Sequence, residues 1–176
     1  AGLTWANVDF RWNSLTIRDK VEGERTIPLT PFVESLLLDL QRRNVRPLRF
    51  PPGEEWEPSP WVFASPTAES GRIQEPRIAH NRALRIAGIE DLTLHGLRRS
   101  FATLTEWLEC PEGIIAQIQG HRPSATRERH YKVRPLDLLR VWHIRIEEWI
   151  LAEAGIDFDP QQSAQGAGLR VVGGAS

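Results

Sequence analysis

The chain has 176 residues, of which 40% are hydrophobic, so it can build one compact domain with a core of its own. Its single cysteine, Cys110, excludes an internal disulfide framework and a metal site made of several cysteines, and it favours a reducing, cytoplasmic setting. The net charge of -1 does not indicate a nucleic-acid-binding protein, because such chains are usually basic.

The hydropathy of the chain and the composition of its two ends predict which parts belong to the folded domain. No apolar run approaches the roughly 20 residues that span a bilayer, and the start lacks the order of a secretion signal, so we expect no membrane contact. The chain opens at Ala1, without Met, directly into a structured segment, which indicates a truncated N-terminus. The residues from Gln161 onward are small and polar, which predicts a flexible tail over 157–176 after one domain at 1–156.

The first third of the chain predicts a small antiparallel sheet followed by a helix. Short runs between turn residues give three strands joined as two hairpins, at Val8–Phe10, Ser14–Arg18 and Arg25–Leu29. Thr30 and Pro31 start a helix that ends near Asn44, with an inward stripe of Val33, Leu36, Leu37 and Leu40. The proline-rich residues 46–60 predict an irregular surface insertion, and 61–64 a brief strand.

Helices dominate the remainder, so the predicted fold class is α+β and mainly α-helical. Residues 76–87 form one helix that Gly88 stops, with an inward face of Ile78, Ala79, Ala83 and Ile86. A second helix starts at Leu94 and carries an apolar stripe of Leu97, Phe101, Leu104 and Leu108.

Two further helices complete the domain. The shorter one runs between Pro111 and Gly120 and buries Ile114, Ile115 and Ile118. The last one, from Pro135 to Ala154, docks on its own domain or on a neighbouring molecule through Leu138, Trp142, Ile146, Trp149 and Ile150.

Three polar side chains hold unusual positions on these helices. At about 100° per residue, His95 and Arg98 lie one turn apart on a face away from the stripe that contains Leu97. This placement is typical of side chains that point into a cleft. Gly120 ends the next helix and therefore puts His121 immediately beyond a helix C-terminus.

Together with Tyr131, and with Lys20 on the second hairpin turn, these residues could act on a phosphodiester. An arginine offers a planar fork of donors for phosphate oxygens, and a histidine can move a proton near neutral pH. A tyrosine hydroxyl has an ordinary pKa of about 10 and becomes a nucleophile when a base takes its proton or cations stabilise the phenolate. A lysine can protonate the leaving group, and the sequence has no acidic cluster that would suggest a two-metal site.

Plainer interpretations of the same residues remain open. The segment 121–145 has seven basic residues against two acidic ones, and a solvated helix surface explains this charge as well as a phosphate contact does. A tyrosine beside arginines is usually half-buried, a hairpin lysine is usually solvated, and a histidine after a helix often only complements the helix dipole. A zinc site from His121, His130 and His143 matches no metal motif, and His80, His130 and His143 are taken as structural or surface residues.

The order of these motifs resembles the tyrosine recombinases, the phage integrase family, up to about Ala154. H-G-L-R-R-S-F-A-T at 95–103 is similar to the family's His-x-x-Arg box, and G-H at 120–121 to the box that follows it. Tyr131 stands ten residues after His121, where the family has its nucleophile. The opening L-T-W-A-N-V-D-F and the hairpin K-V-E-G-E-R-T-I-P-L follow the family's order, with Lys20 eight residues before Pro28.

The resemblance implies the catalytic-domain fold of these recombinases, with a small antiparallel three-stranded sheet and no metal or other cofactor. Tyr131 would attack the scissile DNA phosphate and leave a 3'-phosphotyrosyl bond, Lys20 would protonate the departing 5' oxygen, and Arg98 would clamp the phosphate. His95 would serve as acid and base, and His121 would donate a hydrogen bond to the phosphate. The candidate DNA-binding residues are Arg99, Arg122, Arg127, Arg129 and Lys132.

The resemblance also implies double-stranded DNA with attachment sites as the partner, a homotetramer in the synaptic complex, and a cytoplasmic location. There are two departures from the family. A first catalytic Arg belongs just before the L-T-W segment, where this chain has not yet begun, so the fragment is expected to be folded but inactive, and Gly23 stands near the place of a second hairpin lysine. Alternatives are an inactive DNA-binding or excision-control relic of the same fold, and a type IB topoisomerase.

Overall fold

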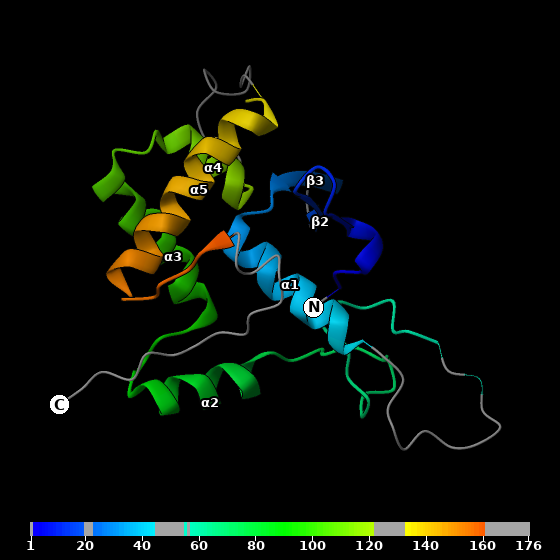
Figure 1. The fold of residues 1–176 in the computed structure, drawn as a ribbon. Coiled ribbons are helices and arrows are strands. Elements are labelled where there is room, and N and C mark those ends of the chain that lie inside the picture. The colour runs from blue at the N-terminus through cyan, green and yellow to red at the C-terminus, as the bar shows by residue number, and fades with distance from the viewer. Residues whose placement is uncertain (1, 20–22, 45–54, 56, 122–132, 161–176) are drawn as a thin grey trace.

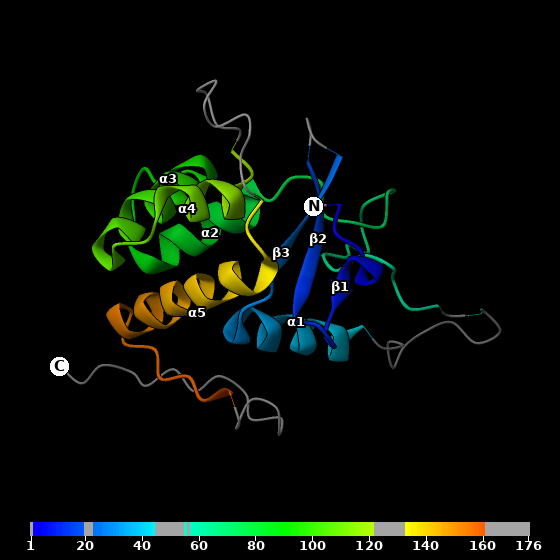
Figure 2. The same cartoon turned by 90° about the horizontal axis from the view of Figure 1, so that it is seen from above.

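The computed structural model describes residues 2–19, 23–44, 55, 57–121 and 133–160. Its helices are α1 (Pro31–Arg43), α2 (Arg77–Ala87), α3 (Leu94–Leu104), α4 (Glu112–Gln119) and α5 (Leu136–Glu153), with short 3-10 turns η1 (Trp5–Asn7) and η2 (Thr105–Leu108). Figures 1 and 2 show α1 beside a small sheet, and α3, α4 and α5 grouped next to both. Within the described ranges, no helix has the length and hydropathy to cross a membrane.

The sheet confirms the predicted fold class and its hairpins. It consists of β1 (Val8–Asp9), β2 (Ser14–Asp19) and β3 (Gly23–Pro28), antiparallel and in that order. The strand ends differ from the predicted ones by only one or two residues. On β3, Glu24 and Thr26 are exposed whereas Arg25 and Ile27 are partly buried, as the two-residue period of a strand requires.

The segment 61–64 is not the strand that the sequence predicts. Trp61 and Ala64 each form only an isolated bridge, to Thr4 and to Arg72 respectively. Most of the proline-rich insertion at 46–60 lies outside the described residues, and its described part, 55 and 57–60, contains no helix or strand.

Two hydrophobic clusters form the core. The first joins the sheet to α1 and consists of Val8, Leu29, Leu37 and Val62. The second lies among the helices and consists of Cys110, Ile114, Ile115, Ile118, Leu139 and Ile146. All three predicted isoleucines of α4 are buried, so this prediction is confirmed. Burial of one such side chain contributes about 1.5–3 kcal/mol, so these three isoleucines anchor α4 in the helical core.

Helix α5 connects the two clusters through Glu147. Its carboxylate accepts hydrogen bonds from the backbone N–H groups of Phe32, at 2.8 Å, and Val33, at 3.3 Å, and from the hydroxyl of Thr30. These donors are the unsatisfied first turn of α1, where a negative charge also complements the helix dipole. A residue of α5 therefore caps α1, so α5 docks on its own domain.

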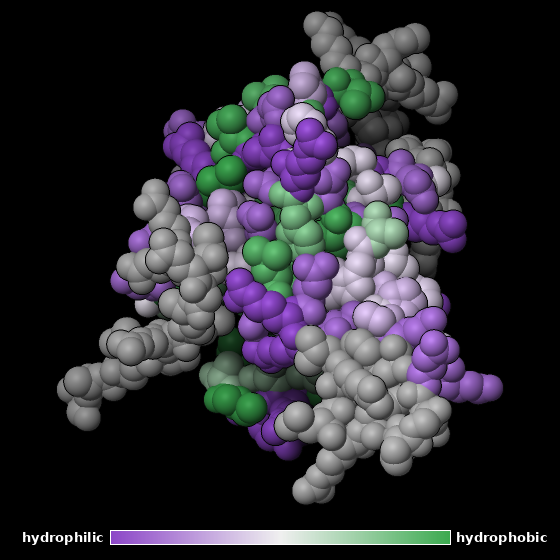
Figure 3. Space-filling model, turned by 45° about the vertical axis from the view of Figure 1, so that its right-hand side comes forward, coloured by the Kyte–Doolittle hydropathy of each residue, from purple (hydrophilic) through white to green (hydrophobic). Residues whose placement is uncertain are grey.

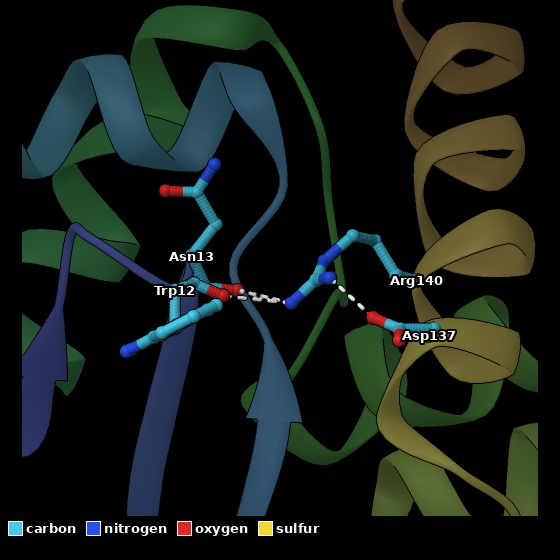
Figure 4. Close-up of polar contacts among 4 residues, drawn as sticks. All are labelled: Trp12, Asn13, Asp137 and Arg140. Carbon is cyan, nitrogen blue, oxygen red and sulfur yellow. Dashed lines mark hydrogen bonds and ion pairs between the residues drawn. The ribbon is translucent and has the colours of Figure 1, made fainter.

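Arg140 makes a second connection from α5 to the sheet (Figure 4). Its Nη2 donates to the carbonyl oxygens of Trp12, at 2.7 Å, and Asn13, at 3.4 Å, in the turn between β1 and β2. Its Nη1 donates to Asp137 at 2.6 Å, which holds the guanidinium in place. Helix α5 is thus held to the sheet at Arg140 and to α1 at Glu147.

Several predicted inward faces are wrong. In α2, the predicted residues Ile78, Ala79, Ala83 and Ile86 are all exposed, and the helix has no buried residue. In α1, Leu37 is buried but Val33 and Leu36 are exposed, and in α5 the buried residues are Leu139, Ile146 and Leu151 while Leu138 and Ile150 are exposed. A hydrophobic period identifies the apolar side of a helix but not which neighbour covers it. On the face seen in Figure 3, hydrophobic residues form separate patches between hydrophilic ones.

Candidate functional site

Arg98 lies on the inward side of α3, contrary to the prediction. Leu97 and Leu104 of the predicted stripe are 46% and 38% exposed, whereas Phe101 and Leu108 do pack on the core. The partly or fully buried residues at helical spacing are Arg98, Phe101, Ala102 and Thr105. The packed face is therefore turned by on the order of 90° from the leucine stripe.

The polar end of Arg98 is satisfied inside the protein, which explains how it occupies that face. Its Nη2 donates a hydrogen bond to the backbone carbonyl of Gln119, the last residue of α4. In return, Nε2 of Gln119 donates to the carbonyl of Arg98 at 2.7 Å. This reciprocal pair, which we call the Arg98–Gln119 clasp, fixes α3 to the C-terminal end of α4.

The G-H dipeptide, Gly120 and His121, comes directly after Gln119 in the chain. Gly120 has a left-handed backbone, with φ of 68°, that non-glycine residues adopt only at a cost, and the N–H of His121 donates to the carbonyl of Ala116 at 2.8 Å. Gly120 therefore ends α4 as predicted and places His121 next to the carbonyl that Arg98 binds. The arginine of the His-x-x-Arg motif therefore lies beside the G-H motif.

Two arginines influence the electrostatic environment of His121. Partial desolvation of the ring lowers the pKa of His121, although the residue is exposed, and the charges of Arg98 and then Arg25 lower it further. Two guanidinium groups, one from α3 and one from β3, thus act on the same imidazole. Such a setting favours an anion.

His95 stands at the first turn of α3 and is exposed. Thr93 caps the helix by accepting a hydrogen bond from the N–H of Gly96 at 2.9 Å. Gly96 is buried, and a Cβ there would come within 3.1 Å of Leu92 and 3.3 Å of Thr93. The glycine of H-G-L-R therefore lets the preceding loop pack closely on the turn that carries His95.

The other predicted site residues fall outside the described ranges. These are the nucleophile Tyr131, the hairpin lysine Lys20, and the basic residues Arg122, Arg127, Arg129 and Lys132. Arg99 is described and is exposed on α3.

The chain that follows Tyr131 returns to α4. The N–H of Arg134 donates to Oε1 of Gln117 at 3.0 Å, and Nε2 of Gln117 donates to the carbonyl of Arg134 at 3.0 Å. The guanidinium of Arg134 lies against Gly113, where a Cβ would collide with it. The segment between His121 and Arg134 therefore leaves from and returns to the same short helix.

The described arginines of the basic segment contact the protein itself. Arg134 binds α4, Arg140 binds the turn at Trp12, and the guanidinium of Arg145 lies 5.3 Å from the ring centre of Trp142. The charges of these three arginines serve contacts within the domain, which is neither the solvated helix surface nor the phosphate contact that the sequence left open.

Two residues of this candidate site were not predicted from the sequence. Arg25 appeared only as the start of a strand, although strand alternation already placed it with Ile27 on one face. Gln119 had no role at all, and its one signal was its position directly before G-H.

A metal centre finds no support in the described part of the chain. There, no three His, Cys, Asp or Glu side chains are grouped so that they could hold an ion. His143, one of the three imagined zinc ligands, is instead largely enclosed, with its ring edge-to-face against Phe101. A surface hollow at the end of α2, lined by residues from Asn81 to Glu90, includes none of the predicted site residues.

Comparison with known proteins agrees with the motifs. The phage integrase family matches residues 1–134. The prophage integrase IntF of Escherichia coli K12 is 57% identical over 156 residues, which cover 89% of this chain but only 32% of that protein. The chain thus spans about a third of the length of this relative, and no solved structure gave a significant match. The match over most of its length shows that the chain belongs to the phage integrase family.

Proposed function

We propose that residues 1–156 are the catalytic part of a site-specific recombinase that cuts and rejoins double-stranded DNA through a 3'-phosphotyrosyl bond. The observation that carries this proposal is the Arg98–Gln119 clasp, which brings the His-x-x-Arg motif to the G-H motif. Membership of the integrase family and the similarity to a prophage integrase support the recombinase class.

The proposed reaction exchanges one phosphoester for another. The hydroxyl oxygen of Tyr131 attacks the phosphorus and its proton passes to His95, while the bond from phosphorus to the 5' oxygen breaks. Lys20 gives that oxygen a proton. A 5' hydroxyl reverses the step and rejoins the strand without ATP, because the covalent link conserves the phosphoester.

Arg98 and His121 stabilise the charge that develops on the phosphate. A guanidinium and an imidazole held by packed elements are oriented before the substrate arrives, so little reorganisation is needed in the transition state. The lowered pKa of His121 keeps its ring neutral at pH 7, and a neutral imidazole still donates one hydrogen bond.

The return of the chain to α4 supports Tyr131 as the nucleophile. Arg134, which follows Tyr131 by three residues, is bound to Gln117. Three residues span at most about 11 Å. This short chain length would allow a nucleophile at position 131 to reach the helix end where the clasp and His121 lie.

Other basic residues are candidates for contacts with DNA phosphates next to the reacting one. Arg99 on α3, together with Arg122, Arg127, Arg129 and Lys132 near Tyr131, would bind neighbouring DNA phosphates at the attachment sites. Because α5 is bound to α1 and to the sheet within its own molecule, assembly into the proposed tetramer would use other surfaces.

The test is covalent capture of DNA. The full-length protein that contains these residues is given a nicked suicide duplex with its attachment site, and adducts that survive denaturation are measured. We expect an adduct that Tyr131→Phe abolishes and whose formation rate Arg98→Gln lowers by about 10²–10³, whereas the control Arg43→Gln on α1 has no effect. An adduct undiminished in Tyr131→Phe would refute the nucleophile, and relaxation of supercoiled DNA by single molecules would favour a type IB topoisomerase.

A further inference from the structure

Arg25 occupies an unusual place for a charged strand residue. It pairs with Ile17 on β2 and shares its partly buried face with Ile27. Its Nε and Nη1 atoms have almost no exposed surface. Arg25 is thus largely enclosed by the protein, unlike most charged residues on a strand.

The neighbouring Arg18 shows what an ordinary position on the same hairpin looks like. It lies opposite Glu24, with 3.8 Å between Nε of Arg18 and Oε1 of Glu24, and its side chain is 90% exposed. Such a pair contributes little to stability because water screens it. The two arginines belong to one hairpin but face different surroundings.

The partly buried face of β3 is turned toward the helices. Helix α5 packs along β3, and both Figures 1 and 2 show the C-terminal end of α4 next to this strand. That end carries the Arg98–Gln119 clasp and His121. The charge of Arg25 reaches the imidazole there together with that of Arg98.

We infer that Arg25 is a further phosphate-binding residue, whose guanidinium contacts the scissile phosphodiester beside Arg98 and His121. The inference rests on the proposed function, which supplies the phosphate. Three donors from β3, α3 and the end of α4 would then surround one anion from three sides. A guanidinium suits this role because it stays charged at any working pH.

Binding of inorganic phosphate to the 176-residue chain tests the inference by NMR. The Nε–H signals of the arginines and the ring signals of His121 are followed in a buffer without competing anions. We expect Arg25, Arg98 and His121 to shift along one saturable curve. We expect Arg25→Gln to weaken phosphate binding about tenfold, as for the loss of one charged hydrogen bond, Arg25→Lys to weaken it less, and Arg18→Gln to leave it unchanged.

The outcomes separate the inference from the proposed function. If Arg98→Gln weakens binding and Arg25→Gln does not, the inference is wrong and the proposed function stands. If neither variant changes phosphate binding, the proposed site itself fails. If Arg25→Gln does not fold, the wild-type signals decide, because an Arg25 Nε–H that stays still while that of Arg98 shifts overturns the inference.

Discussion

Helices α2 and α4 begin after a proline and end at a glycine with a left-handed backbone, with φ of 66° at Gly88 and 68° at Gly120. Their burial is nevertheless opposite. Helix α2 has no buried residue, whereas α4 buries Ile114, Ile115, Ile118 and Gln119. Local signals therefore define where a helix begins and ends, but tertiary contacts decide whether it can hold a functional side chain in place.

The difference extends to what each helix binds. The C-terminal half of α4 receives Arg98, His121 and Arg134 through hydrogen bonds to Gln119, Ala116 and Gln117. The side chain of His80 links helix α2 to the segment that follows it, because its Nε2 lies 2.7 Å from the carbonyl oxygen of Leu92. The site is built on the helix that the core immobilises, as precise chemistry requires.

The largest expected effect comes from removing side-chain volume from each helix. Ile114→Ala in α4, where the side chain is 1% exposed, should lower the free energy of unfolding by about 2–5 kcal/mol. Ile78→Ala in α2, at 79% exposure, should change it by less than about 0.5 kcal/mol. Urea unfolding of the two variants measures both values. Equal losses would mean that α2 is covered in solution and that the comparison is false.

The clasp gives the next largest effect. Gln119→Leu keeps the size of the side chain but leaves the carbonyl of Arg98 without its donor, so we expect a loss of about 1–3 kcal/mol. The matched control is Asn81→Leu on the exposed surface of α2, which should be nearly neutral. Thermal unfolding gives the stabilities, and NMR reports whether the Arg98 side-chain signal moves in Gln119→Leu alone. A neutral Gln119→Leu would show that the clasp does not order the site.

The glycines that end the two helices, Gly88 after α2 and Gly120 after α4, give a third test of the comparison between α2 and α4. Ala at either position must adopt the left-handed conformation, so Gly88→Ala and Gly120→Ala should each lose about 1–2 kcal/mol. Only Gly120→Ala should also shift the ring signals of His121, because Gly120 directs the chain into that residue. A change at His121 caused equally by Gly88→Ala would contradict the separation of the two helices.

The contrast between α2 and α4 also explains which structural features could be predicted from the sequence and which could not. The hairpins, the helix ends and the buried isoleucines of α4 were predictable because they depend on residues close in the chain. The faces of α2 and α3 were not, because Ile78, Ile86 and Leu97 form apolar sides that no described neighbour covers. Arg98 could enter the packed face only because a carbonyl of α4 receives its guanidinium, and this contact leaves no local pattern.

Within the proposed site, the motif residues His95, Arg98 and His121 were identified from their spacing, but Arg25 was not. Its relation to His121 depends on how β3 packs against the helices, which lie far from it in sequence. Residues of this kind are found only when strands and helices are placed together.

The smallest expected effect is a pH dependence that belongs to the packed half of the molecule. Burial lowers the pKa of His143 on α5, although a hydrogen bond to the backbone of Pro28 opposes part of this shift. The unfolded chain therefore binds a proton more readily than the folded one, and stability should fall as the pH drops from about 6.5 toward the folded pKa. His121 adds to this slope in the same direction, since its pKa is lowered too.

Urea unfolding between pH 7.5 and 5.5 measures that slope, and His143→Gln should reduce it by removing the buried imidazole while leaving the contribution of His121. The variant also weakens the packing against Phe101, so the absolute stability is lower at every pH and only the slope is diagnostic. An unchanged slope in His143→Gln would mean that the ring already takes up its proton in the folded state. The contact of α5 with Pro28 would then be looser than the packing around α4 and Glu147 indicates.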